Sequence, residues 1–219
     1  SLFDIFACCR RVPVPLVYDT APVLADPPNS EVHLDLPSAG ASTVLLKHGT
    51  RICGNGCARS NAPIVQDKAY FEVKIQSAGD QWAVGLGSIK TPLNDIDMLS
   101  HCEACWILRQ DGYLWHSSQK LARLLSVPQE GDILGLSYDH SELQFSLNGE
   151  PQVILLPNHT SQNGLTGLRG LLYPIMGVGQ NAVLDVAFSA IHFYYAPPKS
   201  DFEQILFEKD LMQNEQELA

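Results

Sequence analysis

Two pairs of cysteines are the residues of this chain whose spacing could support metal chemistry. Cys53 and Cys57 are separated by three residues, and Cys102 and Cys105 by two, with His101 directly before the second pair. Thiolates in two such pairs can complete the tetrahedral coordination of a structural zinc ion. The alternative is that they are ordinary core thiols, because cysteine is among the most frequently buried residue types. Both pairs lie in strand-like sequence, so we expect no metal and no other cofactor.

One serine and two glycine pairs are the other candidates for chemistry. Residues 135–139 (GLSYD) partly match a nucleophile elbow around Ser137, but the final glycine is missing and the segment lies in a predicted hairpin. The glycine pairs at 85/87 and 177/179 precede no predicted helix, which argues against phosphate-binding loops, and strand glycines commonly mark close packing. No Ser-His-acid set can be assembled from the sequence. We therefore predict no catalytic residues, and a hydrolase is the least favoured function.

The N-terminal stretch SLFDIFACCRR combines apolar side chains, two adjacent cysteines and a basic pair. Cys8 and Cys9 precede the first predicted strand, so they are not core thiols of the folded domain. Dual S-acylation (palmitoylation) of Cys8 and Cys9 fits this pattern, because two acyl chains anchor a protein stably to a membrane whereas one binds only marginally. Docking of the apolar strip on a protein partner, or on the chain's own domain, fits equally well.

Composition limits the classes of partner. The chain has 219 residues, a formal net charge of −10 and 17% charged residues. Phosphate binding depends on clustered Lys and Arg, and the densest basic spot is Arg10-Arg11, so we exclude nucleic acid as a partner. No apolar run approaches the roughly 18 residues of a membrane-spanning helix. The basic pair follows the apolar stretch, unlike a secretory signal, so we expect a cytoplasmic protein with free thiols.

Alternating apolar residues predict several strands that each bury one face. The alternation occurs in EVHLDL (31–36), YFEVKI (70–75), ELQFSL (142–147) and VLDVAF (183–188). Asp111-Gly112 and Asn148-Gly149 separate neighbouring runs and suit two-residue hairpin turns. Many short strands with little helical periodicity indicate an all-β fold, a two-sheet antiparallel β-sandwich. The strand-poor stretches 89–104, 117–130 and 157–170 are predicted loops.

Both ends of the chain depart from this strand pattern. Five prolines interrupt regular structure over residues 1–30, which we predict to be an extended arm. Ser200 followed by Glu203 is a capping-box signature, and Phe202, Ile205 and Leu206 form an apolar stripe. We therefore predict an arm over 1–30, a sandwich over 31–198, and an amphipathic C-terminal helix of about 201–211 with a solvated tail, over 199–219.

Several segments together resemble the SPRY domain family. GDILGLSYDHSELQFSLNG (131–149) is similar to the family's central hairpin, and YFEVKI and WAVGLGS to two further strands. LRGLLYPIMGVGQNAVLDVAFS is similar to the closing strands, with the family's Tyr-Pro pair at Tyr173-Pro174. The double cysteine, RICGNGC and the tail APPKSDFEQILFEKDL resemble a small single-domain branch of the family, since generic members lack this tail.

The resemblance implies a β-sandwich that grips a partner protein through loops at one end and has no enzymatic activity. It also implies that the loop after the Tyr-Pro strand, Gly179, Gln180 and Asn181, lines a peptide pocket. The loops around Arg59 and Asn61 and around Asp97 and Met98 are the other expected walls. We therefore expect a non-enzymatic adaptor. The alternative is a structural subunit of a large protein assembly, held by the N-terminal arm and C-terminal tail.

Overall fold

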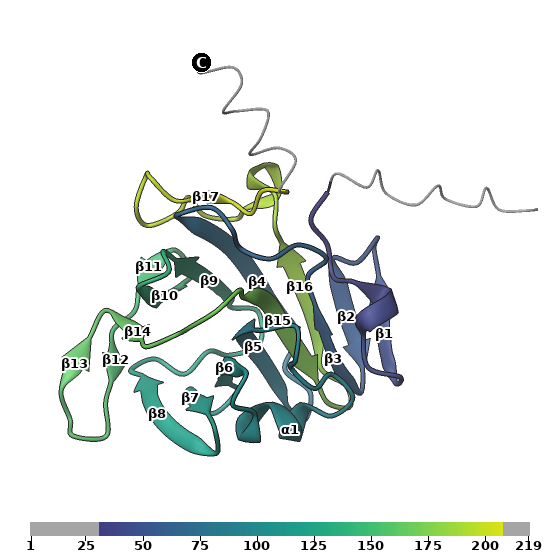
Figure 1. The fold of residues 1–219 in the computed structure, drawn as a ribbon, viewed down its shortest axis with the longest axis horizontal. Helices are drawn as coiled ribbons and strands as arrows, with labels where there is room; N and C mark the ends of the chain where they lie inside the picture. Colours follow the sequence, from purple (N-terminus) through teal and green to yellow (C-terminus); the bar gives the residue numbers. More distant parts are fainter. Residues whose placement is uncertain (1–30, 208–219) are drawn as a thin grey trace, which may run out of the picture.

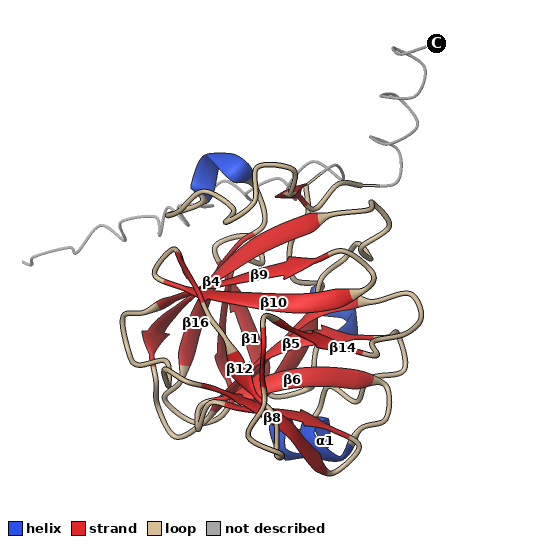
Figure 2. Ribbon diagram, turned by 90° about the vertical axis from the view of Figure 1, so that its left-hand side faces the viewer, coloured by secondary structure: helices blue, strands red, loops and turns tan. Residues whose placement is uncertain are grey.

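The computed structural model describes residues 31–207 of the chain. These residues form two β-sheets packed face to face, with few helices (Figures 1 and 2). The predicted all-β antiparallel sandwich is therefore confirmed. The predicted arm over residues 1–30, with Cys8 and Cys9, and the final residues 208–219 lie outside the described part of the chain.

The first sheet has nine strands in the order β1-β2-β16-β4-β9-β10-β11, with β14 beside β10 and β17 beside β4. Its strands are β1 (Thr43–Leu46), β2 (Arg51–Gly54), β4 (Ala69–Ser77), β9 (Ile133–Tyr138), β10 (Glu142–Leu147), β11 (Glu150–Pro151), β14 (Gly164–Thr166), β16 (Val183–Ala187) and β17 (Glu203–Gln204). Neighbours pair antiparallel except β17, which runs parallel to β4.

The second sheet has eight strands in the order β13-β12-β8-β7-β6-β5-β15-β3. They are β3 (Gly56–Arg59), β5 (Trp82–Gly87), β6 (Cys105–Arg109), β7 (Tyr113–His116), β8 (Gln119–Leu124), β12 (Ile154–Leu155), β13 (Ser161–Gln162) and β15 (Tyr173–Val178). One α-helix, α1 (Ile96–His101), and two short 3-10 helices, η1 (Leu36–Ser38) and η2 (Ala190–His192), complete the described elements. No described helix is long and apolar enough to cross a membrane.

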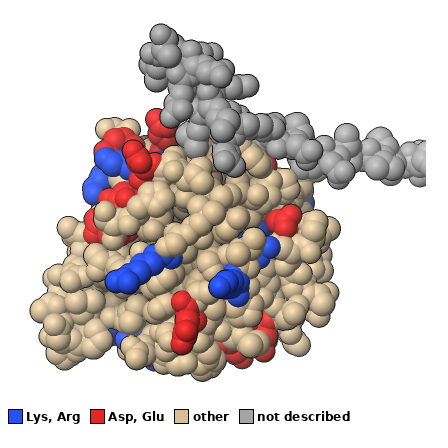
Figure 3. All heavy atoms as spheres, in the orientation of Figure 1, with Lys and Arg blue, Asp and Glu red and all other residues tan. Residues whose placement is uncertain are grey.

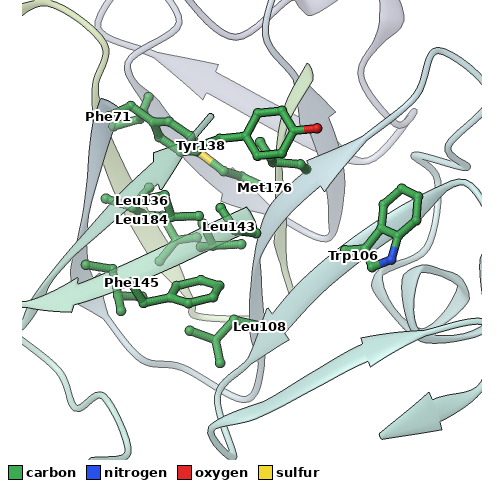
Figure 4. Packing of buried hydrophobic residues seen from close by; sticks show 14 of the residues in the cluster. Phe71, Trp106, Leu108, Leu136, Tyr138, Leu143, Phe145, Met176 and Leu184 are labelled. Carbon is green, nitrogen blue, oxygen red and sulfur yellow. The ribbon is translucent and has the colours of Figure 1, made fainter. Parts of the chain in front are cut away.

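The main core lies between the sheets (Figure 4). Phe71, Leu136 and Leu184 of the nine-stranded sheet are almost fully buried, and so are Leu108 and Met176 of the eight-stranded sheet. This burial follows the predicted alternation, since the intervening residues of β4 and β16 face outward. Each such side chain contributes roughly 1.5–3 kcal/mol of hydrophobic stabilisation, so the inner faces fix how the two sheets stack.

One predicted strand and three predicted loops within the sandwich are wrong. The segment 31–36 is not a strand: it makes one isolated bridge, Leu34 with Ser60, and then enters η1. The physical reason is that Pro37 starts a helical turn and the Asp35 carboxylate accepts a hydrogen bond from Ser38 N (3.1 Å). The predicted loop 117–130 contains strand β8, whose ladder with β7 outweighs its polar sequence. The predicted loop 89–104 contains α1, which the side chain of Asp95 caps. The predicted loop 157–170 contains β13 and β14, which pair with β12 and β10.

The predicted C-terminal helix is absent from the described part of its segment. Residues Glu203–Gln204 instead form β17, beside Ala69 and Tyr70 of β4. This edge of β4 is free there because β16 ends opposite Glu72, and pairing with it outweighs the local capping signature. The sandwich therefore continues past the predicted boundary at 198.

The chain between β16 and β17 covers the outer face of the nine-stranded sheet. Glu72, 1% exposed, points outward from β4. Its carboxylate accepts hydrogen bonds from Tyr194 N (2.5 Å), Tyr195 N (2.9 Å) and the Tyr70 hydroxyl (2.9 Å). The first and last described residues, Glu31 and Phe207, line one groove with Val186–Ser189, so the described chain begins and ends on the same side.

Candidate functional site

The predicted site residues fall into two groups at opposite ends of the sandwich. Gly179, Gln180 and Asn181 form the turn between β15 and β16, and Asp97 and Met98 lie in the first turn of α1. These five residues share one end of the sandwich. The link between them is Arg109, the last residue of β6, which sequence reasoning did not single out.

Arg109 is 8% exposed and connects three elements through its guanidinium. Nη1 donates to Ile96 O (3.3 Å) and to Ser100 Oγ (2.8 Å) of α1. Nη2 donates to Asp97 Oδ1 (3.2 Å) and to Gln81 Oε1 (2.5 Å) just before β5. A guanidinium presents several donors in a rigid plane, so one side chain fixes the relative position of α1 and the start of β5.

Gln81 extends this network to the turn 179–181. The backbone carbonyl of Gln81 accepts from Gly179 N (2.7 Å), and Gln180 O accepts from Asp80 N (3.0 Å). Asn181 adopts a left-handed φ of 64°, which asparagine tolerates better than most residues. We name the connected surface, residues 78–81, 95–98 and 179–181 with Arg109 beneath them, the Arg109 rim.

Helix α1 is held against the outer face of the eight-stranded sheet by packing and by a cap. The Asp95 side chain accepts from Asp97 N (2.9 Å) and begins the helix. Ile96 and Leu99 pack in a second cluster of buried residues, separate from the main core. An added Cβ at Gly177 would lie 3.0 Å from both Cys57 Sγ and Ile96 Cγ1, so this strand glycine permits the close approach.

The side chains that the Arg109 rim presents to solvent are polar or flexible. Gln180, Asn181 and Asp97 are exposed, and the Met98 side chain is 52% exposed although methionine is apolar. Gly179 is buried, so it shapes the turn rather than contacting a partner through a side chain. An exposed, adaptable thioether side chain among polar groups is typical of protein-binding surfaces.

Arg59 and Asn61 lie at the other end of β15. The register pairs Gly56 with Val178 but Arg59 with Ile175, so Arg59 lies toward the Tyr173 end. Arg59 donates from Nη1 to Ile89 O (3.2 Å). The structure therefore does not bring Arg59 together with Gln180.

Asn61 has a structural role in this fold. Its side-chain oxygen accepts from His33 N (3.0 Å), and its Nδ2 donates to Glu31 O (3.1 Å). These bonds fasten the first described residues to the end of β3. The amide is thereby used within the chain, at the opposite end from the Arg109 rim.

The cysteines do not form the zinc site considered from the sequence. Cys53 faces outward from β2, whereas Cys57 and Cys105 are buried under α1 with Cys102 packed against them. Burial raises the pKa of Cys57 to about 12, and burial together with the neighbouring Cys102 raises the pKa of Cys105, so both remain protonated thiols near neutral pH. Within residues 31–207, no group of three or more His, Cys, Asp or Glu is arranged to hold a metal ion.

Ser137 lies in the middle of β9, opposite Gln144 of β10 and Tyr70 of β4, and is 6% exposed. A nucleophile elbow requires a sharp turn that exposes the serine, and a ladder position between two strands does not provide one. Gly85 approaches the backbone of β6, where an added Cβ would lie 2.0 Å from Trp106 O. The glycine pairs thus serve strand packing.

Comparison of the sequence with known proteins identifies the family of this chain. A model of the SPRY domain matches residues 68–191. SPRY domain-containing protein 7 from Homo sapiens and from Bos taurus is 40% identical over 182 residues, which covers 82% of this chain and 86% of each relative. This chain belongs to the SPRY domain family.

Solved SPRY structures share the fold at low sequence identity. The SPRY domain of human HERC1 superposes with a TM-score of 0.54 at 15% identity, covering 70% of this chain and 96% of that one. The TRIM65 PSpry domain gives a TM-score of 0.53 at 16% identity, covering 71% of this chain and 88% of that one. These likenesses support the two-sheet architecture of this SPRY domain.

Proposed function

We propose that this SPRY domain is a non-enzymatic adaptor that binds a partner protein through the Arg109 rim. The family is a protein-interaction fold, which supports a protein partner. One observation carries the assignment to this end: the buried Arg109 holds α1 and the residues around Gln81 in fixed relative positions while Asp97, Met98 and Gln180 stay exposed. A surface that is ordered before binding loses less conformational entropy on association.

Partner capture by rim variants tests this proposal. Tagged full-length protein is compared with a variant carrying Met98→Ala and Gln180→Ala, and captured proteins are quantified by mass spectrometry. We expect specific capture to fall about tenfold, which corresponds to about 1.4 kcal/mol of binding free energy. The matched control carries Leu171→Ala and Gln162→Ala, which are exposed residues elsewhere in the domain. Equal capture by both variants would exclude the rim as the binding surface.

A structural subunit of a large assembly is the alternative, based on the tail segment that generic SPRY domains lack. An adaptor exchanges between bound and free forms, whereas a subunit keeps a fixed stoichiometry. Pulse-labelled protein added to a purified complex distinguishes them: exchange within hours supports the adaptor, and none supports the subunit.

We also propose that the protein is cytoplasmic and that acylation of Cys8 and Cys9 holds it at membranes. The support is the SLFDIFACCRR pattern, which lies outside the described residues. Replacing both cysteines by serine should move the protein to the soluble fraction, whereas Cys53→Ser in the folded domain should not. Unchanged fractionation, with no thioester-linked lipid by metabolic labelling, would favour a protein-docking arm instead.

A further inference from the structure

The two residues of β17 occupy a place beside β4 that the rest of the sheet leaves open. Strand β16 pairs with β4 from Ser77 to Glu72 and stops there. The adjoining stretch, Ala69 and Tyr70, pairs with Glu203 and Gln204 instead. β17 lies at the edge where β4 begins (Figure 1). Among the described ladders this is the one parallel pairing, and it involves only two residues from each strand.

Besides the short ladder with β4, a glutamine side chain binds the backbone of this segment. Gln66 Nε2 donates to Gln204 O (2.6 Å), and Gln66 Oε1 accepts from Leu206 N (2.8 Å). One carbonyl and one N–H on either side of a residue are what a neighbouring strand would bind. Gln66 is 9% exposed, so its amide offers a prepared donor and acceptor for an extended chain.

Two buried side chains give this segment a recognisable pattern. Phe202 is 5% exposed, and its ring lies beside the ammonium groups of Lys68 and Lys199, with Nζ 5.9 Å and 5.8 Å from the ring centroid. Ile205 is 3% exposed and joins the main core. Backbone pairing with alternate side chains in pockets is how sheet edges bind extended peptides.

Polar side-chain contacts also hold the segment at Gln204 and at Asp201. The Gln204 side-chain oxygen accepts from Ala190 N (2.7 Å). Lys68 Nζ forms an ion pair with Asp201. The chain before this point contains Pro197 and Pro198, and residues 194–196 and 198–201 are exposed. The exposed residues 198–201 thus connect the chain held by Glu72 to this segment, which is then held by backbone contacts and by its own side chains.

We propose that this place, formed by Gln66, Lys68 and the start of β4, is a peptide-binding site occupied in cis by residues 201–206. Its ligand class is an extended segment with an aromatic residue followed three positions later by an aliphatic one, preceded by a carboxylate that pairs with Lys68. A partner protein that carries such a segment competes with the chain's own. The site does not depend on the Arg109 rim, which lies at the other end of β16.

Cleavage of the connecting loop tests the site in the full chain. A site for a specific protease is inserted between Pro198 and Lys199, and the cleaved protein is incubated with a labelled synthetic peptide of residues 199–219. We expect the cleaved fragment to co-elute with the body and to exchange with the labelled peptide. Peptides with Phe202→Ala or Ile205→Ala should compete at least tenfold more weakly, and these peptide changes leave the folding of the body untouched.

A matched pair of body variants sharpens the test. Gln66→Leu removes both amide contacts and should shorten the retention of the peptide at least tenfold, whereas Gln162→Leu on exposed β13 should not change it. The proposal is overturned if the altered peptides compete as well as the parent peptide, or if Gln66→Leu retains the peptide normally. It is also overturned if the cleaved body unfolds and excess peptide fails to restore it, since the segment would then be an inseparable part of the fold.

Discussion

Two buried charged side chains hold non-strand segments against the outer faces of the two sheets: Arg109 on the eight-stranded sheet and Glu72 on the nine-stranded sheet. Glu72 accepts hydrogen bonds from the backbone of one covering segment, at Tyr194 and Tyr195, and from the hydroxyl of its neighbour Tyr70. Arg109 instead donates to side chains and carbonyls of α1 and of Gln81. The Glu72 carboxylate holds one covering segment in place. The Arg109 guanidinium also fixes α1 and Gln81 relative to each other, and these belong to the exposed Arg109 rim.

Glu72→Ala should have the largest effect on stability. It leaves two backbone N–H groups and the Tyr70 hydroxyl without an acceptor, which should lower the free energy of unfolding by about 4 kcal/mol. Urea unfolding measures this loss, and Glu150→Ala on the exposed β11 is the control. If Glu72 holds its covering segment and has no part in the Arg109 rim, the folded fraction of Glu72→Ala still captures the rim partner. Loss of less than about 1 kcal/mol would show that the carboxylate is not what holds the segment.

Arg109→Ala should lower the free energy of unfolding by about 3 kcal/mol, because Asp97, Ser100 and Gln81 lose their shared donor. Arg109→Lys should restore little of this, since one ammonium group cannot reach all four acceptors. Unlike Glu72→Ala, this variant should also lose partner capture when assayed below its melting temperature. The exposed Arg123→Ala is the control. Normal partner capture by folded Arg109→Ala would show that Arg109, like Glu72, matters for stability only and does not position the rim.

The ion pair of Asp185 with Arg51 faces outward and holds no covering segment. Its contribution to stability is therefore a comparison for those of Glu72 and Arg109. The side chains of Asp185 and Arg51 lie 2.5 Å apart between β16 and β2. Burial alone would raise the pKa of Asp185, but the hydrogen bonds and charges of Arg51 and Lys47 outweigh it and hold that pKa below its usual value. A depressed carboxylate pKa contributes stability that is present above the unfolded pKa of about 3.9 and is lost as pH falls through the folded pKa.

Arg51→Met should therefore cost about 1 kcal/mol at pH 7, and this cost should shrink as the pH falls below about 3.9 and through the folded pKa of Asp185, as measured by thermal unfolding. Asp67→Asn, which removes an exposed charge, is the control variant. A constant difference at all pH values would mean that the effect comes from packing of the Arg51 stem rather than from the ion pair.

The smallest effects on stability are expected within the exposed rim itself. Gln180→Ala should change the free energy of unfolding by less than about 0.5 kcal/mol while reducing partner capture. Asn181→Ala should cost about 1 kcal/mol because the residue has a left-handed φ of 64°, and Asn181→Gly should cost much less. Differential scanning fluorimetry measures the melting temperatures of the Asn181→Ala and Asn181→Gly variants. Equal melting temperatures for the alanine and glycine variants would contradict the backbone explanation.

Patterns of period two predicted the sandwich because β4, β10 and β16 turn alternate side chains into the main core. The central strands β5, β6 and β9 are buried at every position. Phe71, Val73 and Ile75 of β4 are buried as their alternation requires. The pattern is misleading where a local contact outweighs it. The segment 31–36 leads into η1 at Pro37 instead of forming a strand, and the free edge of β4 makes residues 203–204 a strand instead of a helix.

The candidate site was only partly predictable. The resemblance to SPRY domains led to the turn 179–181 and to Asp97 and Met98, which the structure brings to one end. Arg109 was missed because nothing local distinguishes a buried arginine at a strand end from an exposed one. Its one sequence signal is a charged residue directly after the apolar run CWIL, at a position where the alternation of β6 points to a covered face. Arg59 and Asn61 were assigned to the wrong end of the sandwich because the composition of a loop does not show in which direction the neighbouring strand runs.

The start and end of the described chain share one groove, and the Arg109 rim lies at the other end of β16. Five residues of strand separate these poles by about 17 Å. Figure 3 shows Lys, Arg, Asp and Glu side chains as small separate groups on the face that it draws, with uncharged surface between them. A ligand on the rim and a tether at either chain end would therefore not collide, and the domain would act as a short rigid spacer. Such a tether would raise the effective concentration of the rim near whatever the chain ends hold, so two weak attachments could together give lasting residence.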